Sequence, residues 1–403
     1  MKKFLVLLFS ALFCLSACTA GEGNIPDDST IEVNIKTEIV DTSDYETDAP
    51  TPPEDVVKKA SFVGCGDNII YYGTWRDANK NANWKGYDFT PMYDNVREQI
   101  SAADIAFINQ ECVSDSTREP SSYPGFNCPT EVADALVEVG FDVVSLANNH
   151  MLDQGPSGLA NSYNYWLTKG VTLLGCHEEN DRGIYVTYTE TNGIKIAYVS
   201  YTYGTNLGGD PADYGLYASY LKYADVEGEI GEARANSDFV IVSVHWGEEG
   251  HTQPSAEQRS YAQLMADSGA DVIIGHHPHV IQPVEWIEGK DGNKTLCYFS
   301  LGNFLHEQNY QYNIVGGMAC FNIVKTNDGH AVAEDVQFIP TACHYPQNFY
   351  GNTVYYLSDY NESLASQHAV RTYYNHECSF SYMVDLVVST IKKEYLPEWY
   401  LDK

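Results

Sequence analysis

From residue 60 onward, short apolar runs alternate with amphipathic stretches, and this alternation limits the possible folds more than any other feature. Each apolar run predicts a buried strand. The strand-like runs are SFVGCG (61–66), DIAFIN (104–109), DVVSLA (142–147), VTLLG (171–175), IKIAYVSY (194–201), DFVIVSVHW (238–246), DVIIGH (271–276), LCYFSLGN (296–303) and GMACFNIVK (317–325).

The stretches between these runs predict helices, several with proline near the start. We expect them at 91–102, 130–139, 156–169, 225–236 and 254–268. TNG (191–193) and KDGN (290–293) are typical of hairpin turns between antiparallel strands. Early strand–helix alternation followed by hairpins predicts a mixed α/β sandwich rather than a purely parallel sheet.

Polar side chains that can bind metal follow six of the predicted strands. In open α/β sheets, ligands bind beyond the carboxyl ends of the strands. A single Asp or His at such a position is usually a turn or rim residue. Packing alone does not explain why six strands are each followed by a polar residue of this kind. The residues are Asp67; Asn109 and Glu111; Asn148, Asn149, His150 and Asp153; His245 and the following Glu248; His276, His277 and His279; and Asn303.

Carboxylate, amide and imidazole groups together suit Mn, Fe or Zn rather than Ca²⁺. We therefore expect one or two divalent transition-metal ions at this edge of the sheet. Such a centre would polarise an ester oxygen and ionise a bound water.

The charge balance excludes some partners. Lys and Arg number 23 against 55 Asp and Glu, which gives a formal net charge of -32. A surface this acidic excludes nucleic acid or anionic lipid bound through a basic patch.

The N-terminus predicts export and lipidation. Residues 1–17 have two lysines and then a short apolar run, as in a signal peptide. Leu15-Ser16-Ala17-Cys18 resembles the lipobox of bacterial lipoproteins, in which the cysteine becomes lipidated. We therefore expect a protein outside the cytoplasm, held on the bacterial cell surface through Cys18. Residues 18–58, rich in Asp, Glu, Thr and Pro, predict a flexible acidic tether.

The remaining chain divides into a domain at 59–345 and a C-terminal extension at 346–403. We expect the extension to pack on the domain and to contain few strands or helices. Cys65, Cys297 and Cys320 lie in apolar strand-like runs, where a thiol acts as a small hydrophobe. Cys112 with Cys128 is the one local disulfide candidate, and the sequence does not decide the pairing.

The ordered motifs resemble known families. Asp67, Asn149-His150, His245 and His277-Pro278-His279 resemble, in order, blocks of the calcineurin-like metallophosphoesterases. Over about residues 60–345, the chain resembles more closely the CapA family of bacterial poly-γ-glutamate capsule proteins. The matching motifs are Gly66-Asp67, Asn109-Gln110-Glu111, Asn148 through Gly155, His245-Trp246-Gly247, Gly275 through His279, and Ser300 through Phe304.

This resemblance implies a four-layer α/β/β/α metallophosphoesterase-type sandwich. Within it, the chemistry of the strand-end residues suggests a role for each of them. His150 would be the general acid, oriented by Asp153. His279 would be a metal ligand or would stabilise an oxyanion. The implied metal ligands are Asp67, Glu111, Asn149, His245, His277 and His279. Residues that bind substrate or support the ligands would be Asn109, Asn148, Glu248, His276 and Asn303.

The resemblance also implies a role in the synthesis, release or anchoring of poly-γ-glutamate or a related cell-surface polymer. The strand-end residues themselves predict metal-assisted hydrolysis or acyl transfer. The protein's partners would be this anionic polymer, the membrane through the lipid, and other capsule-synthesis proteins. Two residues depart from the phosphoesterase pattern: Ile69 replaces a histidine, and Glu111 replaces an aspartate. Two alternatives therefore stay open, a metal-dependent phosphoesterase on extracellular substrates and a non-catalytic polymer-binding lipoprotein.

Overall fold

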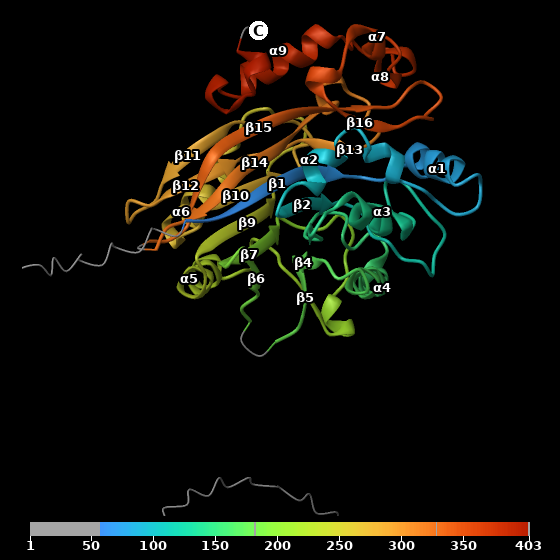
Figure 1. The fold of residues 1–403 in the computed structure, drawn as a ribbon. Coiled ribbons are helices and arrows are strands. Elements are labelled where there is room, and N and C mark those ends of the chain that lie inside the picture. The colour runs from blue at the N-terminus through green and yellow to red at the C-terminus, as the bar shows by residue number, and fades with distance from the viewer. Residues whose placement is uncertain (1–56, 181–182, 328, 402–403) are drawn as a thin grey trace, which may run out of the picture. The chain divides into compact units, whose positions relative to one another are not determined.

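Two mixed β-sheets lie at the centre of the protein (Figure 1). The structure is a computed structural model that describes residues 57–401, apart from 181–182 and 328. Each sheet combines a block of parallel strands with antiparallel strands that extend it. In sheet order, the first sheet has β16 (Thr353–Tyr356), β15 (Val332–His344), β14 (Val315–Lys325), β1 (Lys58–Asn68), β2 (Ile105–Gln110), β3 (Val143–Ser145) and β4 (Thr172–Leu174), with β13 (Asn303–Leu305) pairing with β1.

The second sheet repeats this plan with fewer strands. A separate two-stranded sheet joins β5 (Cys176–Glu178) to β8 (Leu216–Ala218). In sheet order, the second sheet has β11 (Val284–Glu288), β12 (Lys294–Tyr298), β10 (Val272–His276), β9 (Phe239–His245), β7 (Ile194–Thr202) and β6 (Thr187–Thr191).

Helices cover the outer faces of both sheets (Figure 1). Against the second sheet, α5 and α6 enclose a small core of their own, which includes Ile230 and Met265. The helices are α1 (Tyr72–Asn81), α2 (Arg97–Ser101), α3 (Glu131–Val139), α4 (Gly155–Leu167), α5 (Val226–Asn236), α6 (Ala256–Ser268), α7 (Glu362–Ala365), α8 (Ala369–Thr372) and α9 (Phe380–Thr390).

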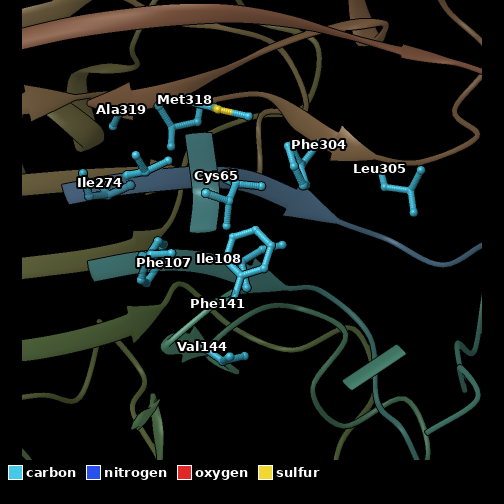
Figure 2. Close-up of a cluster of buried hydrophobic side chains, with 14 of the residues drawn as sticks. Cys65, Phe107, Ile108, Phe141, Val144, Ile274, Phe304, Leu305, Met318 and Ala319 are labelled. Carbon is cyan, nitrogen blue, oxygen red and sulfur yellow. The ribbon is translucent and has the colours of Figure 1, made fainter. Parts of the chain in front are cut away.

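A larger core includes residues of both sheets and of the helices on the first sheet. Figure 2 shows part of it, where Cys65 of β1, Phe107 of β2, Ile274 of β10 and Met318 of β14 lie together. Side chains from two sheets in one core, with helices outside each sheet, confirm the expected α/β/β/α sandwich.

Every predicted strand run forms a strand, and both predicted hairpin turns join antiparallel partners, β6 to β7 and β11 to β12. The helix expected at 91–102 is wrong as a single element. A 3-10 turn, η1 (Thr90–Tyr93), and α2 share that segment, because the Asp94-Asn95 turn separates them.

The C-terminal expectation is also wrong in part, since residues 346–401 contain β16 and three helices. Val370, Met383 and Val387 of this segment belong to the large core. Helices as short as α7 and α8 complete only about one turn, so they leave no periodic signal in the sequence.

All cysteines of the described residues are free and buried, including Cys112 and Cys128. The signal peptide, Cys18 and the tether through residue 56 lie outside the described residues. Within the described part of the chain, no helix has both the length and the apolar character needed to cross a bilayer.

Candidate metal centre

The carboxyl ends of strands from both sheets meet at one edge of the sandwich, where the six predicted ligands lie buried. On the first sheet, one ligand is the second-last residue of β1, one directly follows β2 and one lies in the turn after β3. On the second sheet, one ends β9 and two follow β10. The first sheet thus supplies Asp67, Glu111 and Asn149, and the second supplies His245, His277 and His279.

Two overlapping groups of possible ligands share Glu111. One group joins Asp67, Glu111 and His245, and the other joins Glu111, His277 and His279. Within each group, the ligand atoms lie within 4.8 Å of one another. Glu111 Oε1 is 3.6 Å from Nε2 of His245 and 3.6 Å from Nε2 of His279. These residues could hold one or two ions, and Glu111 belongs to both groups.

The residues present fit a metal. Glu111 Oε1 and His277 Nδ1 are buried and have no hydrogen-bond partner among the described residues. Buried polar atoms are rarely left unpaired in this way, and a bound cation would supply the missing partner. Asn149 adds an amide oxygen, since its Oδ1 lies 2.9 Å from His245 Nε2. This mixture of nitrogen and oxygen donors suits a divalent transition metal.

Two motif glycines allow the strands to come close enough. A Cβ at Gly66 would lie 2.0 Å from the Gly302 carbonyl oxygen, and a Cβ at Gly275 would lie 2.0 Å from that of Phe299. Just beyond Gly275, His277 and His279 have φ of +94° and +55°, values that cost side-chain-bearing residues energy. The strained turn aims both imidazoles at the carboxylates.

Burial sets the charge of the cluster. It lowers the pKa of His245 well below the usual range and that of His277 to about 3, so both rings are neutral near pH 7. Burial, with the charge of Asp67 next, raises the pKa of Glu111 far above its usual range. Burial would also raise the pKa of Asp67, but hydrogen bonds from His276 and His279 hold it well below its usual range. Neutral imidazoles keep a lone pair free for a metal.

Three of the predicted supporting residues hold the ligands in place. Asn303 Oδ1 lies 3.0 Å from His279 Nδ1, so Nδ1 carries the proton and Nε2 faces Glu111 as an acceptor. Asn109 Nδ2 donates to Asp67 Oδ1 at 2.8 Å. Asn148 Nδ2 donates to a backbone carbonyl at the end of β2, and this bond ties the turn after β3 to the neighbouring strand.

The other two supporting residues behave differently. His276 Nδ1 lies 3.3 Å from Asp67 Oδ1, and its ring packs 5.6 Å from that of Phe107. Glu248 is exposed and pairs with His251 at 3.7 Å, so it stands outside the buried cluster. Its neighbour Glu249 is also exposed, but its charge helps to raise the pKa of Glu111.

His150 is held in a defined orientation at the same edge. Its Nδ1 lies 2.7 Å from Asp153 Oδ2, and its ring meets that of Phe126 edge-on at 4.8 Å. Asp153 also accepts a hydrogen bond from the backbone amide of Phe126 at 2.8 Å, which fixes the carboxylate in turn. Because the carboxylate accepts from Nδ1, Nε2 is the nitrogen that can exchange a proton with a bound molecule.

Two further residues of this edge were not predicted. Tyr203, 43% exposed, lies over His277 with 4.6 Å between ring centroids. Asn206 donates its backbone amide to the Asn149 carbonyl at 2.7 Å, and its Nδ2 lies 3.5 Å from His150 Nε2. Both follow β7, so the rule applied to the other strands, polar residues at a carboxyl end, would have found them.

Comparison with known proteins decides the family. The model of the family described as "Bacterial capsule synthesis protein PGA_cap" matches residues 61–308, more than half of the chain. The chain belongs to this family. A PGA_cap relative, the PGA biosynthesis protein CapA of Bacillus subtilis, is 29% identical over 286 residues, which cover 68% of this chain and 70% of the relative.

A second relative is the capsule biosynthesis protein CapA of Bacillus anthracis. It is 32% identical over 185 residues, but these cover only 45% of this chain and 44% of the relative. Among solved structures, the NAD nucleotidase NadN of Haemophilus influenzae is similar over 72% of this chain and 52% of the NadN chain. The sequence identity is 11% and the TM-score is 0.39. Because this TM-score is below 0.5, we infer nothing from that likeness.

The structure also shows what replaces the histidine of the phosphoesterase pattern. Ile69 is buried in the large core, and its backbone amide donates to the Leu305 carbonyl at 2.8 Å. Its side chain is hydrocarbon, so the PGA_cap protein described here has no ligand at this position. Any metal would be held by the remaining six residues.

Proposed function

We propose that this PGA_cap protein acts in the synthesis, release or anchoring of poly-γ-glutamate or a related cell-surface polymer, by metal-assisted hydrolysis or acyl transfer. Family membership and the names of the Bacillus relatives support the polymer. The buried cluster in which two ligand groups share Glu111 is the observation that supports the chemistry.

In this proposal, Asp67, Glu111, Asn149, His245, His277 and His279 hold the ion. A bound divalent metal would polarise the carbonyl or phosphoryl oxygen of a substrate and lower the pKa of a bound water. His150, next to Asn149, would give a proton from Nε2 to the leaving group, while Asp153 keeps its ring in position. Tyr203, which lies over His277, would contact the substrate.

We also propose that the domain works outside the cytoplasm and is anchored to the membrane by a lipid on Cys18. The motif Leu15-Ser16-Ala17-Cys18 supports this location. An anionic polymer made or handled at the cell surface would meet the domain there, together with other capsule-synthesis proteins.

One observation favours a second candidate. The hydrocarbon side chain of Ile69, where the phosphoesterase pattern has a ligand, fits a binding protein with a reduced site. Polymer binding that survives a chelator, with no turnover of poly-γ-glutamate, would support this candidate. Metal-dependent hydrolysis of simple phosphate esters would instead support a phosphoesterase.

The metal itself is the first test. Protein purified without chelator should retain about one or two equivalents of a transition metal by elemental analysis. Changing His245→Ala and His277→Ala together should remove nearly all of it. His251→Ala is the matched control, because His251 is exposed and lies outside the cluster. Wild-type metal content in the double variant would show that the ligands are wrongly chosen.

A further inference from the structure

A large groove opens next to the candidate metal centre. Its volume is about 990 Å³, at the upper end of the range for ligand pockets. Its lining contacts the metal-binding turns directly. Gln308 accepts a hydrogen bond from Asn303, and Asn313 donates one to the His279 carbonyl at 3.0 Å. A molecule lying in the groove would therefore reach the edge of the centre.

Exposed aromatic rings gather around this groove. Tyr72, Tyr123, Tyr310 and Tyr373 line it and are 53%, 70%, 45% and 60% exposed. Exposed rings collected at one concave site indicate a binding surface. Tyr310 is stacked on Tyr312 with centroids 5.2 Å apart and planes 12° from parallel, so it forms a fixed, flat platform.

The charged groups of the groove disfavour an anionic ligand. Arg76 donates to the Asn348 carbonyl at 2.8 Å, and its guanidinium lies 4.6 Å from the ring centroid of Tyr350. Glu307 is buried and accepts three hydrogen bonds from the protein. Arg76 keeps its positive charge, but the exposed carboxylate of Glu249 offsets it, so the groove offers no net positive charge on a chain whose formal charge is -32. A polyanion would be repelled from this surface.

The uncharged polar groups of the lining include side-chain amides, among them those of Asn309 and Gln347. Amides and phenols can each donate and accept hydrogen bonds. Flat rings that pack on the apolar face of a sugar, next to amides that bond its hydroxyls, match the two-sided chemistry of a carbohydrate. We propose that this groove binds an uncharged carbohydrate chain.

This ligand differs from the anionic polymer of the proposed function, and its binding does not depend on the metal. The groove would hold a glycan, and the anionic polymer would meet the centre beside His150 and Tyr203, neither of which lines the groove. The chain would thus bring two polymers together, one neutral and one anionic.

The test is the binding of two uncharged hexasaccharides, the β-1,4-linked hexamers of glucose and of N-acetylglucosamine, measured by isothermal titration calorimetry. At least one should bind the wild-type protein. Tyr310→Ala and Tyr373→Ala should each weaken binding about fivefold or more, as expected for the loss of one aromatic contact. Tyr223→Ala is the control, because Tyr223 is 75% exposed but lies outside the groove.

A charge variant tests the exclusion of anions. Glu249→Lys should raise the affinity for a poly-γ-glutamate oligomer and leave hexasaccharide affinity within about twofold, because the replaced carboxylate acts mainly through charge. The His245→Ala, His277→Ala double variant should bind hexasaccharide normally, which separates this inference from the metal proposal. Three results would overturn it. They are no binding of either hexasaccharide, wild-type affinity in both the Tyr310→Ala and Tyr373→Ala variants, and preferential binding of poly-γ-glutamate by the wild-type groove.

Discussion

At the residue scale, His150 distinguishes an enzyme from a binding protein. Its ring is fixed by Asp153 and Phe126, and none of the bonds that hold it involves a predicted metal ligand's side chain. His150→Ala should therefore leave metal content and thermal midpoint nearly unchanged while lowering turnover about a hundredfold or more. His150→Gln should lower turnover almost as much, because an amide cannot transfer the proton.

Turnover on poly-γ-glutamate and on simple phosphate esters should be measured on the same preparations as metal content and thermal midpoint. His251→Ala again serves as the control. A stable, metal-replete His150→Ala protein with full activity would exclude the acid role.

We expect Glu307 to make the free energy of unfolding depend on pH. Its carboxylate accepts hydrogen bonds from the Gly73 amide, Thr74 and Asn352, and so holds the start of α1. Burial nevertheless raises its pKa from 4.5 to about 7. Between these values the folded protein binds more protons than the unfolded chain, so the contribution of Glu307 to the free energy of unfolding falls as pH rises through this window.

Compared with Glu307→Gln, the wild type should lose up to about 3 kcal/mol of unfolding free energy between about pH 5 and pH 8. Urea unfolding across this range would measure the difference. Glu334→Gln, on an exposed position of β15, is the control. A constant difference between the wild type and Glu307→Gln would show that this carboxyl titrates normally in the folded state.

At the scale of elements, the approach of β10 to its neighbours depends on Gly275. A Cβ there would collide with a backbone oxygen, which cannot move aside as a flexible side chain could. Gly275→Ala should lower the free energy of unfolding by about 2 kcal/mol or more and reduce metal content. Gly231→Ala in α5 is the matched control, because nothing lies within 4 Å of its added Cβ.

Gly231→Ala should instead stabilise the protein by about 0.5–1 kcal/mol, since alanine favours a helix interior. Thermal unfolding with metal analysis would compare the two. Equal stability of the wild type and Gly275→Ala would contradict the packing explanation.

Element prediction succeeded where burial leaves a continuous apolar run, as in β9 and in β1 from Phe62 onward, where every residue is buried. It missed β15, in which exposed and half-buried residues dominate the first half, and α1, which has little apolar character. The site was predictable because parallel strands place their carboxyl ends together. The path of the chain directly after β9 was not predictable, because Gly247 turns it with a φ of +89°, which leaves no periodic pattern in the sequence.

At the scale of the whole molecule, the N-terminus predicts where the protein is found. Cys18→Ala should move it from the membrane to the soluble fraction, because the mature chain would lose its lipid. Cell fractionation with immunoblotting measures this. Cys378→Ala, at a buried cysteine far along the chain, is the control for losing a thiol. Membrane association unchanged by Cys18→Ala would refute the anchor.

The equal division of the predicted ligands between the two sheets has a mechanical consequence. An ion held by Asp67, Glu111 and Asn149 on one side and by three histidines on the other would link the two sheets. Its binding energy then opposes their separation, at about 2.7 kcal/mol when free metal is a hundred times the dissociation constant. Scarcity of metal in the medium would thus lower the fraction of the protein that is folded.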